Sequence, residues 1–358
     1  MKIAVACGGT GGHIFPGLAT AQVLADRGHE VTLWMAGKDV EAQALEGWPG
    51  RTIQVPAQGF PTRFSLRGVQ SAWSLAKAVR TVRRLMIKEQ PEVLLAMGSY
   101  ASVGPVGAAI SLRIPYVLHE ANVVPGRAIK FFSRRAGAIC GCFEETRYYL
   151  RGRDLIITGM PLRRPVVEAA RRHAPHAGGK HFHLLVMGGS RGAHALNELI
   201  SEALIHLHRR GVGIEVTHLT GTEDEMWVEN RYDTAGLLHT VRAFTNRIED
   251  LYARADFAIC RSGASTCAEL AAFALPALLV PFPFAVKNHQ MANARVLEKA
   301  GAADVVPESD LTVEWLTTYI ERMCRVEERR ISMARAAAEW AYTDGAERLA
   351  DQVERQAR

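Results

Sequence analysis

The sequence has few cysteines, and none of them shows the spacing of a disulfide framework or a zinc ribbon. Six cysteines are spread over 358 residues, and no Cys-x-x-Cys pair occurs. Small domains that depend on disulfides are much denser in cysteine. The pair Cys140 and Cys142 has a spacing that can in principle hold a soft metal, but small buried thiols in a reducing cytosol explain it better.

Long apolar runs and clustered metal ligands are also missing. No stretch approaches the ~20 apolar residues that a membrane-spanning helix needs. The first residues lead directly into glycines without the apolar core of a signal peptide, so we expect no export. Two His-x-His pairs, at 181–183 and 206–208, lack companion ligands at zinc spacing, so no metal site is expected.

The chain is long enough for two domains and carries a modest excess of positive charge. A single hydrophobic core rarely extends over a chain as long as 358 residues, so we expect two domains. Hydrophobic residues make up 48% of the chain, which is a globular composition, and the formal net charge is +6. An excess of positive charge is compatible with binding to nucleic acid, anionic lipid or phosphorylated ligands, and it does not distinguish among them.

Short apolar runs alternate with longer helix-like stretches, which is typical of parallel sheets with crossover helices. The alternation breaks near 158–180 and restarts with a buried strand. The sequence therefore predicts an α/β fold with two Rossmann-like halves and a mainly helical end at 331–350. The expected strands are 3–6, 31–35, 52–55, 93–96, 116–119 and 138–142 in the first half, and 183–187, 214–219, 241–244, 257–260 and 277–281 in the second.

Each half opens with a strand that leads into a glycine-rich turn. The turn Gly8–His13 precedes a helical pattern from Leu18. Glycines permit close backbone approach, and a helix start offers N–H groups and a positive dipole end to an anion, so a ligand with phosphate fits here. A nicotinamide-binding turn needs a third glycine where Ile14 stands, and a P-loop needs Gly-Lys-Ser/Thr; neither is present.

His13 is the first catalytic candidate. It stands at the mouth of the turn, where ligands bind in open α/β sheets. Imidazole titrates near neutrality, which suits a general base. A histidine that only caps or packs on the helix is the alternative that the sequence leaves open.

Two similar turns lie in the second half. Gly188–Ala193 carries Ser190, whose hydroxyl can donate to a phosphate oxygen. Arg261–Thr266 precedes a helix that we place from Cys267, with Glu269 in its first turn. A carboxylate there can accept hydrogen bonds from a vicinal diol such as ribose, or it can simply complement the helix dipole.

The motifs follow one another in an order that resembles one enzyme family. The opening Gly8–Pro16 closely resembles that of the MurG family, which transfers N-acetylglucosamine from its UDP derivative to a lipid-linked muramyl-pentapeptide. The motifs taken together are specific for this family, although no single motif is. The resemblance continues through Gly98–Ser102, His119–Asn122, Gly188–Ala193, Arg261–Thr266 and Glu298–Ala303.

The resemblance implies a GT-B fold, in which two Rossmann-like domains face a deep cleft. Residues 1–160, joined by a C-terminal helix at about 340–358, would bind the acceptor and associate with the membrane. Residues 161–339 would bind the UDP-sugar donor. Family members invert the anomeric centre and do not depend on a bound metal ion. UDP-N-acetylglucosamine would therefore enter as a substrate, and no cofactor is expected.

The resemblance also implies the reaction and its place in the cell. The 4-hydroxyl of MurNAc in undecaprenyl-diphospho-muramyl-pentapeptide would attack the donor sugar, so that lipid I becomes lipid II in peptidoglycan synthesis for cell wall, cell shape and cell division. The enzyme would be peripheral on the cytoplasmic face of the plasma (inner) membrane and would meet an anionic membrane surface. Other cell-wall synthesis proteins are candidate partners, and no nucleic acid is expected.

Site roles carry over position by position. His13 would be the general base, with Glu120 as the next candidate for that role. Tyr100, Glu120 and Asn122 would line the acceptor side, and Asn122 also matches a donor-contacting position. Gly263 to Ala268 would surround the donor phosphates. The other substrate contacts implied are Thr10, Gly11, Gly12, Arg163, Ser190 and Thr245, then Gly263, Ala264, Ser265, Thr266, Cys267 and Ala268, with Glu269 at the ribose and His289 and Gln290 at the transferred sugar.

Three features depart from the family pattern. Thr245 stands where a branched apolar residue often lies over uracil, and Met160 replaces a usual asparagine. The loop 281–290 is longer and more apolar than in many members. These changes leave the exact base and sugar contacts open, but they do not touch the glycine framework.

The segment 63–88 is where we expect contact with lipid. Its basic residues and its apolar stripe lie on roughly opposite faces, which also fits an ordinary amphipathic helix. The preceding loop, 60–67, interleaves apolar and basic side chains, and such a surface binds anionic lipid by about 1 kcal/mol per basic residue. The basic residues are Arg63, Arg67, Lys77, Arg80, Arg83, Arg84 and Lys88, and the stripe is Leu75, Val79, Val82 and Met86.

Three other functions compete with this interpretation. A diacylglycerol glycosyltransferase of the same fold shares the donor half, but not the patterns at Tyr100 and His119–Asn122. A nicotinamide-dependent oxidoreductase lacks its third glycine. A nucleic-acid-binding module would explain the basic helix but not the repeated strand-to-helix turns.

Overall fold

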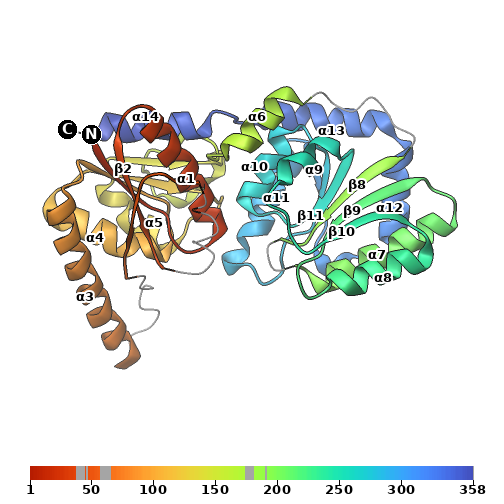
Figure 1. Cartoon of the computed structure of the whole chain (residues 1–358), viewed down its shortest axis with the longest axis horizontal. Coiled ribbons are helices and arrows are strands. Elements are labelled where there is room, and N and C mark those ends of the chain that lie inside the picture. The colour runs from red at the N-terminus through yellow and green to blue at the C-terminus, as the bar shows by residue number, and fades with distance from the viewer. Residues whose placement is uncertain (38–44, 46, 57–65, 174–180, 190–191, 358) are drawn as a thin grey trace. The chain divides into compact units, whose positions relative to one another are not determined.

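The chain divides into two compact units, each built on one parallel sheet (Figure 1). The computed structural model describes residues 1–37, 45, 47–56, 66–173, 181–189 and 192–357. Unit 1 comprises Met1–Arg164 and Tyr342–Arg358, and unit 2 comprises Pro165–Ala341. The predicted α/β class with two Rossmann-like halves is confirmed.

The sheet of unit 1 has seven parallel strands in the order β3-β2-β1-β4-β5-β6-β7. β1 and β4 are neighbours, with Ile3 opposite Val93, so the strand order reverses between them. Ligands of such sheets bind outside the carboxyl ends of the strands at this reversal. The strands are β1 (Lys2–Ala6), β2 (Glu30–Met35), β3 (Arg51–Gln54), β4 (Val93–Ala96), β5 (Tyr116–Glu120), β6 (Ala138–Gly141) and β7 (Ile156–Ile157).

Two hydrophobic cores cover the two faces of this sheet. One includes side chains of α1 and of the terminal helix α14, and the other includes side chains of α3, α4 and α5. Arg27, which follows α1, binds Asp351 at 2.8 Å and Glu354 at 2.9 Å, so α14 is also held at its surface. The helices are α1 (Gly11–Asp26), α3 (Leu66–Glu89), α4 (Val103–Leu112), α5 (Arg127–Phe132) and α14 (Gly345–Gln356), with short 3-10 helices η1 (Tyr100–Ser102), η2 (Ser133–Arg135) and η3 (Glu144–Tyr149).

Unit 2 repeats this plan with six parallel strands in the order β10-β9-β8-β11-β12-β13. Its strand order reverses between β8 and β11, where Cys260 pairs with Met187. The strands are β8 (Phe182–Met187), β9 (Ile214–Leu219), β10 (Leu238–Arg242), β11 (Phe257–Cys260), β12 (Ala277–Leu279) and β13 (Ala303–Val305). The helices are α6 (Arg164–Arg172), α7 (His194–Arg209), α8 (Glu225–Ala235), α9 (Ile248–Arg254), α10 (Ala264–Ala272), α11 (His289–Lys299), α12 (Val313–Arg325) and α13 (Glu327–Trp340), with η4 (Val286–Asn288) and η5 (Glu308–Asp310).

Two details of the secondary structure differ from the expectation. The strand expected at 241–244 lies at Leu238–Arg242, because pairing with β9 sets its register. The short strands β7 and β13 were not predicted, since two or three residues are too few to show a pattern. The mainly helical end expected at 331–350 is confirmed, with one break, because α13 ends at Trp340 and α14 begins at Gly345.

Candidate functional site

The first turn of α1 holds the best-placed catalytic candidate of unit 1. Thr10 is the N-cap, so the helix begins at Gly11, well before the predicted start at Leu18, and His13 lies in its first turn. An N-cap threonine usually accepts a hydrogen bond from a backbone N–H of that turn. Here the Thr10 Oγ1 lies instead 3.0 Å from Nδ1 of His13. The imidazole is thereby held by a turn whose first N–H groups lack helical acceptors and favour an anion.

Gly9 lets this turn lie against the end of the neighbouring strand. Its φ of +125° favours glycine, and a Cβ there would lie 3.5 Å from the Cβ of Ser99. Ser99 shapes the turn after β4 by accepting the N–H of Ala101 at 3.2 Å. Tyr100, which follows, is 65% exposed. The turns after β1 and β4 therefore adjoin where the strand order reverses, and the Tyr100 side chain is open to a ligand.

Glu120 ends β5, and both of its carboxylate oxygens bind its own loop. Oε1 accepts the N–H of Asn122 at 2.9 Å, and Oε2 accepts the N–H of Gly126 at 2.8 Å. The Asn122 side-chain amide donates to Oε1 at 3.4 Å. Burial raises the pKa of Glu120, and these hydrogen bonds oppose the rise. The carboxylate is thus engaged in shaping the loop 121–126, which presents Asn122.

His119 precedes Glu120 and is buried. Burial, with a smaller contribution from the charge of His13, lowers its pKa to about 4 against the opposing effect of a hydrogen bond with Gly159. Its Nε2 lies 3.4 Å from the carbonyl oxygen of Gly159 and 3.6 Å from Sγ of Cys142. A histidine with this pKa is neutral near pH 7 and too weak a base to take a proton there. His119 therefore supports the site by packing and hydrogen bonding.

Arg163 lies beside the start of α1. Its guanidinium carbon is 5.1 Å from the centre of the Phe15 ring. The same ring lies 3.3 Å from where a Cβ of Gly11 would be. Arg163 thus adds positive charge near the helix N-terminus, where it suits a phosphate. The sequence did not reveal the role of Phe15, because an aromatic residue in an apolar helix pattern indicates only core packing.

In unit 2, the turn after β11 is joined to the start of α11 by buried hydrogen bonds. Ser262 Oγ donates to the carbonyl oxygen of Gln290 at 2.9 Å, and Asn293 Nδ2 donates to the carbonyl oxygen of Ser262 at 3.2 Å. These contacts bring the predicted sugar-contacting residues His289 and Gln290 beside the turn 261–266. Ser262 and Asn293 were not predicted, because a single buried hydroxyl or amide carries no sequence pattern.

The helix after this turn starts earlier than predicted. Gly263 is its N-cap and α10 begins at Ala264, so the expected start at Cys267 is wrong. Ser265 and Thr266 therefore lie in the first turn, where the N–H groups lack helical acceptors. Glu269 lies in the second turn and accepts a hydrogen bond from the Tyr252 hydroxyl at 2.9 Å. The effect of the helix dipole falls off beyond the first turn, so interaction with the dipole explains Glu269 less well than the sequence suggested.

The loop between β12 and α11 is exposed and apolar at its tip. Phe284 is 83% exposed, and its ring packs edge-on against Phe282 at 5.7 Å. The Arg261 guanidinium carbon lies 5.6 Å from the Phe282 ring. Gln290 Oε1 accepts the N–H of Phe282 at 2.9 Å, which fixes the carboxamide against the base of the loop. The loop thus supports the orientation of Gln290.

Thr245 and Ser190 are two further predicted contacts of unit 2. Thr245 Oγ1 accepts the N–H of Arg247 at 3.1 Å, just before α9, so it acts locally on its own turn. The neighbouring Phe244 is 53% exposed and presents an open ring. Ser190 lies outside the described residues, and its phosphate contact stays a prediction.

A buried polar network supports the end of the turn that precedes α7. Asn197 Nδ2 donates to the carbonyl oxygen of Thr220 at 2.9 Å and to Asp224 Oδ2 at 2.7 Å. Its Oδ1 must then accept from Nε2–H of His218, 3.1 Å away, because an amide has one acceptor oxygen. Nδ1 of His218 is left to accept the Tyr232 hydroxyl at 2.9 Å. Every member is hydrogen-bonded, which makes such a network rigid.

Acid should destabilise unit 2 through this network. Burial lowers the pKa of His218 to about 3, whereas an unfolded histidine titrates near ~6.5. The unfolded chain therefore binds more protons between those values. The contribution of neutral His218 to the free energy of unfolding is complete above pH ~6.5. It falls by up to about 1.4 kcal/mol for each pH unit as the pH is lowered toward ~3. In urea unfolding, we expect the difference between wild type and His218→Gln to shrink as the pH falls; an unchanged difference would contradict the assignment.

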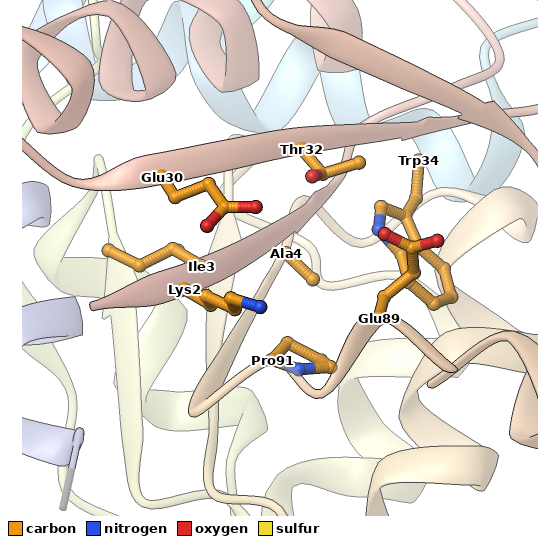
Figure 2. A pocket seen from close by; sticks show the side chains of 8 residues that line it. All are labelled: Lys2, Ile3, Ala4, Glu30, Thr32, Trp34, Glu89 and Pro91. Atoms are coloured by element: carbon orange, nitrogen blue, oxygen red, sulfur yellow. The ribbon is translucent and has the colours of Figure 1, made fainter. Parts of the chain in front are cut away.

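A small pocket of unit 1 lies away from these turns. It is lined at the amino ends of β1 and β2, by Lys2 and Glu30 among others (Figure 2). Its volume of about 10 Å³ has room for no more than a water molecule. Trp34, which borders it, has a buried Nε1 with no partner among the described residues, and a water there would satisfy it. This pocket is too small for a substrate. Its other lining residues are Ile3, Ala4, Thr32, Glu89 and Pro91.

Comparisons with known proteins identify the family. Residues 3–140 match the glycosyltransferase family 28 N-terminal domain, and residues 183–349 match the glycosyltransferase family 28 C-terminal domain. A relative from Anaeromyxobacter sp. (strain Fw109-5) is 37% identical over 98% of this chain and 92% of its own. A relative from Geobacter sulfurreducens is 35% identical over 99% and 98%. Both are named UDP-N-acetylglucosamine--N-acetylmuramyl-(pentapeptide) pyrophosphoryl-undecaprenol N-acetylglucosamine transferase.

The chain belongs to glycosyltransferase family 28 and, within it, to the MurG transferases. The crystal structure of MurG from Acinetobacter baumannii is 27% identical, covers 99% of both chains and has a TM-score of 0.82. The resemblance drawn from the motifs and the glycosyltransferase class are confirmed. Among the residues that the structure describes, no group of three or more His, Cys, Asp or Glu side chains is placed to hold a metal ion.

Proposed function

We propose that this MurG transferase moves N-acetylglucosamine from UDP-N-acetylglucosamine to the 4-hydroxyl of MurNAc in undecaprenyl-diphospho-MurNAc-pentapeptide, so that lipid I becomes lipid II. The names of the curated relatives support this reaction. The observation that carries it is the turn at Thr10–His13, where an imidazole is oriented by a threonine at the carboxyl end of β1. A diacylglycerol acceptor is not favoured, because the relatives' names specify the muramyl acceptor.

His13 is the proposed general base. Its Nδ1 lies 3.0 Å from the Thr10 hydroxyl oxygen, which orients the ring, and Nε2 is the nitrogen proposed to act on the acceptor hydroxyl. Nε2 takes the proton as the hydroxyl oxygen attacks the anomeric carbon. The bond from that carbon to the UDP oxygen breaks on the opposite side, and UDP leaves with the electron pair. The configuration at the anomeric carbon is therefore inverted. Tyr100 and Asn122 are the proposed contacts on the acceptor side.

The donor is proposed to bind unit 2. The first-turn N–H groups of α10, with Ser265 and Thr266, would hold the diphosphate as its charge grows. Preorganised donors of this kind are each worth a few kcal/mol in the transition state. Glu269 would bind the ribose, and Gln290 with His289 the sugar.

Glu120 is proposed to position the acceptor loop rather than to act as the base. We expect Glu120→Gln to lower kcat/KM about tenfold to a hundredfold, since its amide would leave one backbone N–H of the loop unpaired at a cost of about 1–3 kcal/mol. The acid limb of the pH profile should stay in place. Its disappearance in the variant would make Glu120 the base. Glu168→Gln, which alters an exposed carboxylate on α6, serves as the control.

A peripheral position on the cytoplasmic face of the plasma membrane follows from the proposed substrates, since one is a nucleotide sugar and the other a lipid. No helix among the described parts of the chain is both long and apolar enough to cross a bilayer. The predicted lipid contact at 60–65 lies outside those parts. Contacts with other cell-wall synthesis proteins stay a prediction.

The proposed reaction is tested with UDP-N-acetylglucosamine and a short-chain, water-soluble analogue of the muramyl acceptor. We expect the disaccharide and UDP in equal amounts. The matched reactions replace the donor by UDP-glucose or the acceptor by diacylglycerol, and both should be much slower. Turnover of diacylglycerol without turnover of the muramyl analogue would refute the proposal.

A further inference from the structure

We propose that Tyr252 is a positioning residue of the donor site. Its hydroxyl holds the Glu269 carboxylate in the orientation that distinguishes ribose from 2′-deoxyribose in a uridine diphosphate ligand. This inference rests on the proposed function, in which Glu269 binds the ribose of the donor. It adds to that function a buried residue from another helix, which acts through the carboxylate rather than on the ligand.

The ring of Tyr252 is fixed by packing. Tyr252 lies on α9 and is 1% exposed, and its ring centre is 5.4 Å from that of Phe273, which follows α10. Phe273 is itself 1% exposed. A phenylalanine in place of Tyr252 would make the same ring contact, so this packing does not require the phenol hydroxyl. The hydroxyl must therefore be explained by what it binds.

The hydroxyl of Tyr252 donates to a carboxylate of the next helix. Its Oη lies 2.9 Å from Oε2 of Glu269, which is partly exposed on the second turn of α10. A buried phenol loses its hydrogen bonds to water and is normally paired. A bond to an ionised acceptor is among the stronger hydrogen bonds that a side chain makes. The pair therefore joins a rigid buried ring to a carboxylate that a ligand can reach.

The carboxylate of Glu269 lies near the place where ligands bind a sheet of this kind. The strand order of unit 2 reverses between β8 and β11, and Cys260 is the last residue of β11. Burial is the main cause of the raised pKa of the Cys260 thiol, and the negative charge of Glu269 adds to it. The carboxylate is thus close to the carboxyl end of β11. Ligands bind outside that end of the strands at the reversal.

A fixed carboxylate matters for the recognition of a diol. Two adjacent hydroxyl groups can donate to one carboxylate only when its oxygens face both of them. The glutamate side chain has several rotatable bonds, and ordering such a side chain at binding weakens affinity by about threefold to tenfold. Tyr252 fixes the orientation of the Glu269 carboxylate before the nucleotide arrives. A nucleotide without the 2′-hydroxyl leaves an acceptor of the site unpaired, and sites that bind a hydroxyl reject such analogues strongly.

Tyr319 provides a matched control within unit 2. Its hydroxyl donates to Oδ2 of Asp304 at 2.6 Å, so Tyr319→Phe also removes a bond from a phenol to a carboxylate. Asp304 lies on β13, at the edge of the sheet, and also accepts a hydrogen bond from Arg329. None of these three residues is a proposed substrate contact. Tyr319→Phe therefore reports the general cost of losing such a bond in this unit, without a change at Glu269.

The test is calorimetric titration of the full-length protein with UDP and with 2′-deoxy-UDP. Wild type should bind UDP about tenfold or more tightly, because the deoxy analogue lacks one hydrogen bond to a charged acceptor. In Tyr252→Phe this preference should fall about threefold to tenfold, through weaker binding of UDP. Tyr319→Phe should keep the wild-type preference. In a Glu269→Ala background, Tyr252→Phe should have no further effect on the affinity for UDP.

Kinetics give a second readout. Because Tyr252 acts on nucleotide binding, Tyr252→Phe should raise KM for UDP-N-acetylglucosamine by the same factor, while kcat stays near the wild-type value. An unchanged preference for UDP in this variant would overturn the inference. So would an equal loss of affinity for both nucleotides, which would indicate a structural role, or the same loss of preference in Tyr319→Phe. A wild type that binds both nucleotides equally would refute the proposed ribose contact itself, and the inference with it.

Discussion

Replacement of His13 by alanine is expected to lower kcat by about 10²–10⁴-fold, which is the usual contribution of a general base. UDP affinity should stay at the wild-type value, because the proposed diphosphate contacts lie on α10 of unit 2. Stopped assays with the soluble acceptor analogue give kcat, and calorimetric titration gives the UDP affinity. Near-normal turnover in His13→Ala would remove it as the base and return Glu120 to consideration.

Thr10 provides a graded control for the same site. Thr10→Ser keeps the hydroxyl that bonds Nδ1 of His13, whereas Thr10→Val removes it at nearly constant volume. One hydrogen bond of this kind is worth about 1 kcal/mol, so we expect roughly a fivefold to tenfold loss of kcat in the valine variant and little change in the serine variant. Equal losses in both would indicate that the hydroxyl does not orient the imidazole.

Gly192→Ala is expected to be among the most destabilising substitutions in unit 2, at about 4 kcal/mol or more. Its φ of +74° already disfavours a side chain, and a Cβ would collide with the carbonyl oxygen of Thr220. That oxygen accepts from Asn197, so its displacement would open the buried network around His218. Urea unfolding measures the loss, and UDP titration should show weaker binding because the turn before α7 is deformed.

Gly211→Ala is the matched control for that experiment. Gly211 has nearly the same φ, +77°, and open space where its Cβ would be. Gly211→Ala should lower the free energy of unfolding only by the cost of a side chain at positive φ, about 1–2 kcal/mol. If both variants lost the same stability, backbone conformation alone would account for Gly192, and the contact with Thr220 would be unimportant.

The strands and the glycine turns could be predicted because their signals are local. A strand buried on both faces is a short apolar run, and a strand-to-helix turn that approaches a ligand needs small residues. The start of α10 was placed too late, at Cys267 instead of Ala264, since Ser265 and Thr266 resemble loop residues until their helix is packed. The register of β10 depends on its partner β9, which no local pattern contains.

By itself the sequence determined the two-sheet α/β plan, the turn that carries His13 and membership of the MurG transferases, because each depends on residue types at short and regular spacing. Only the tertiary structure decided how side chains are used. It directed both oxygens of Glu120 into the loop of Asn122, joined Ser262 to Gln290, turned Val82 and Met86 of α3 inward, and left Phe131 and Tyr148 exposed. A pattern shows that a helix has an apolar face, but burial and hydrogen bonding depend on which neighbours the sheet brings against it.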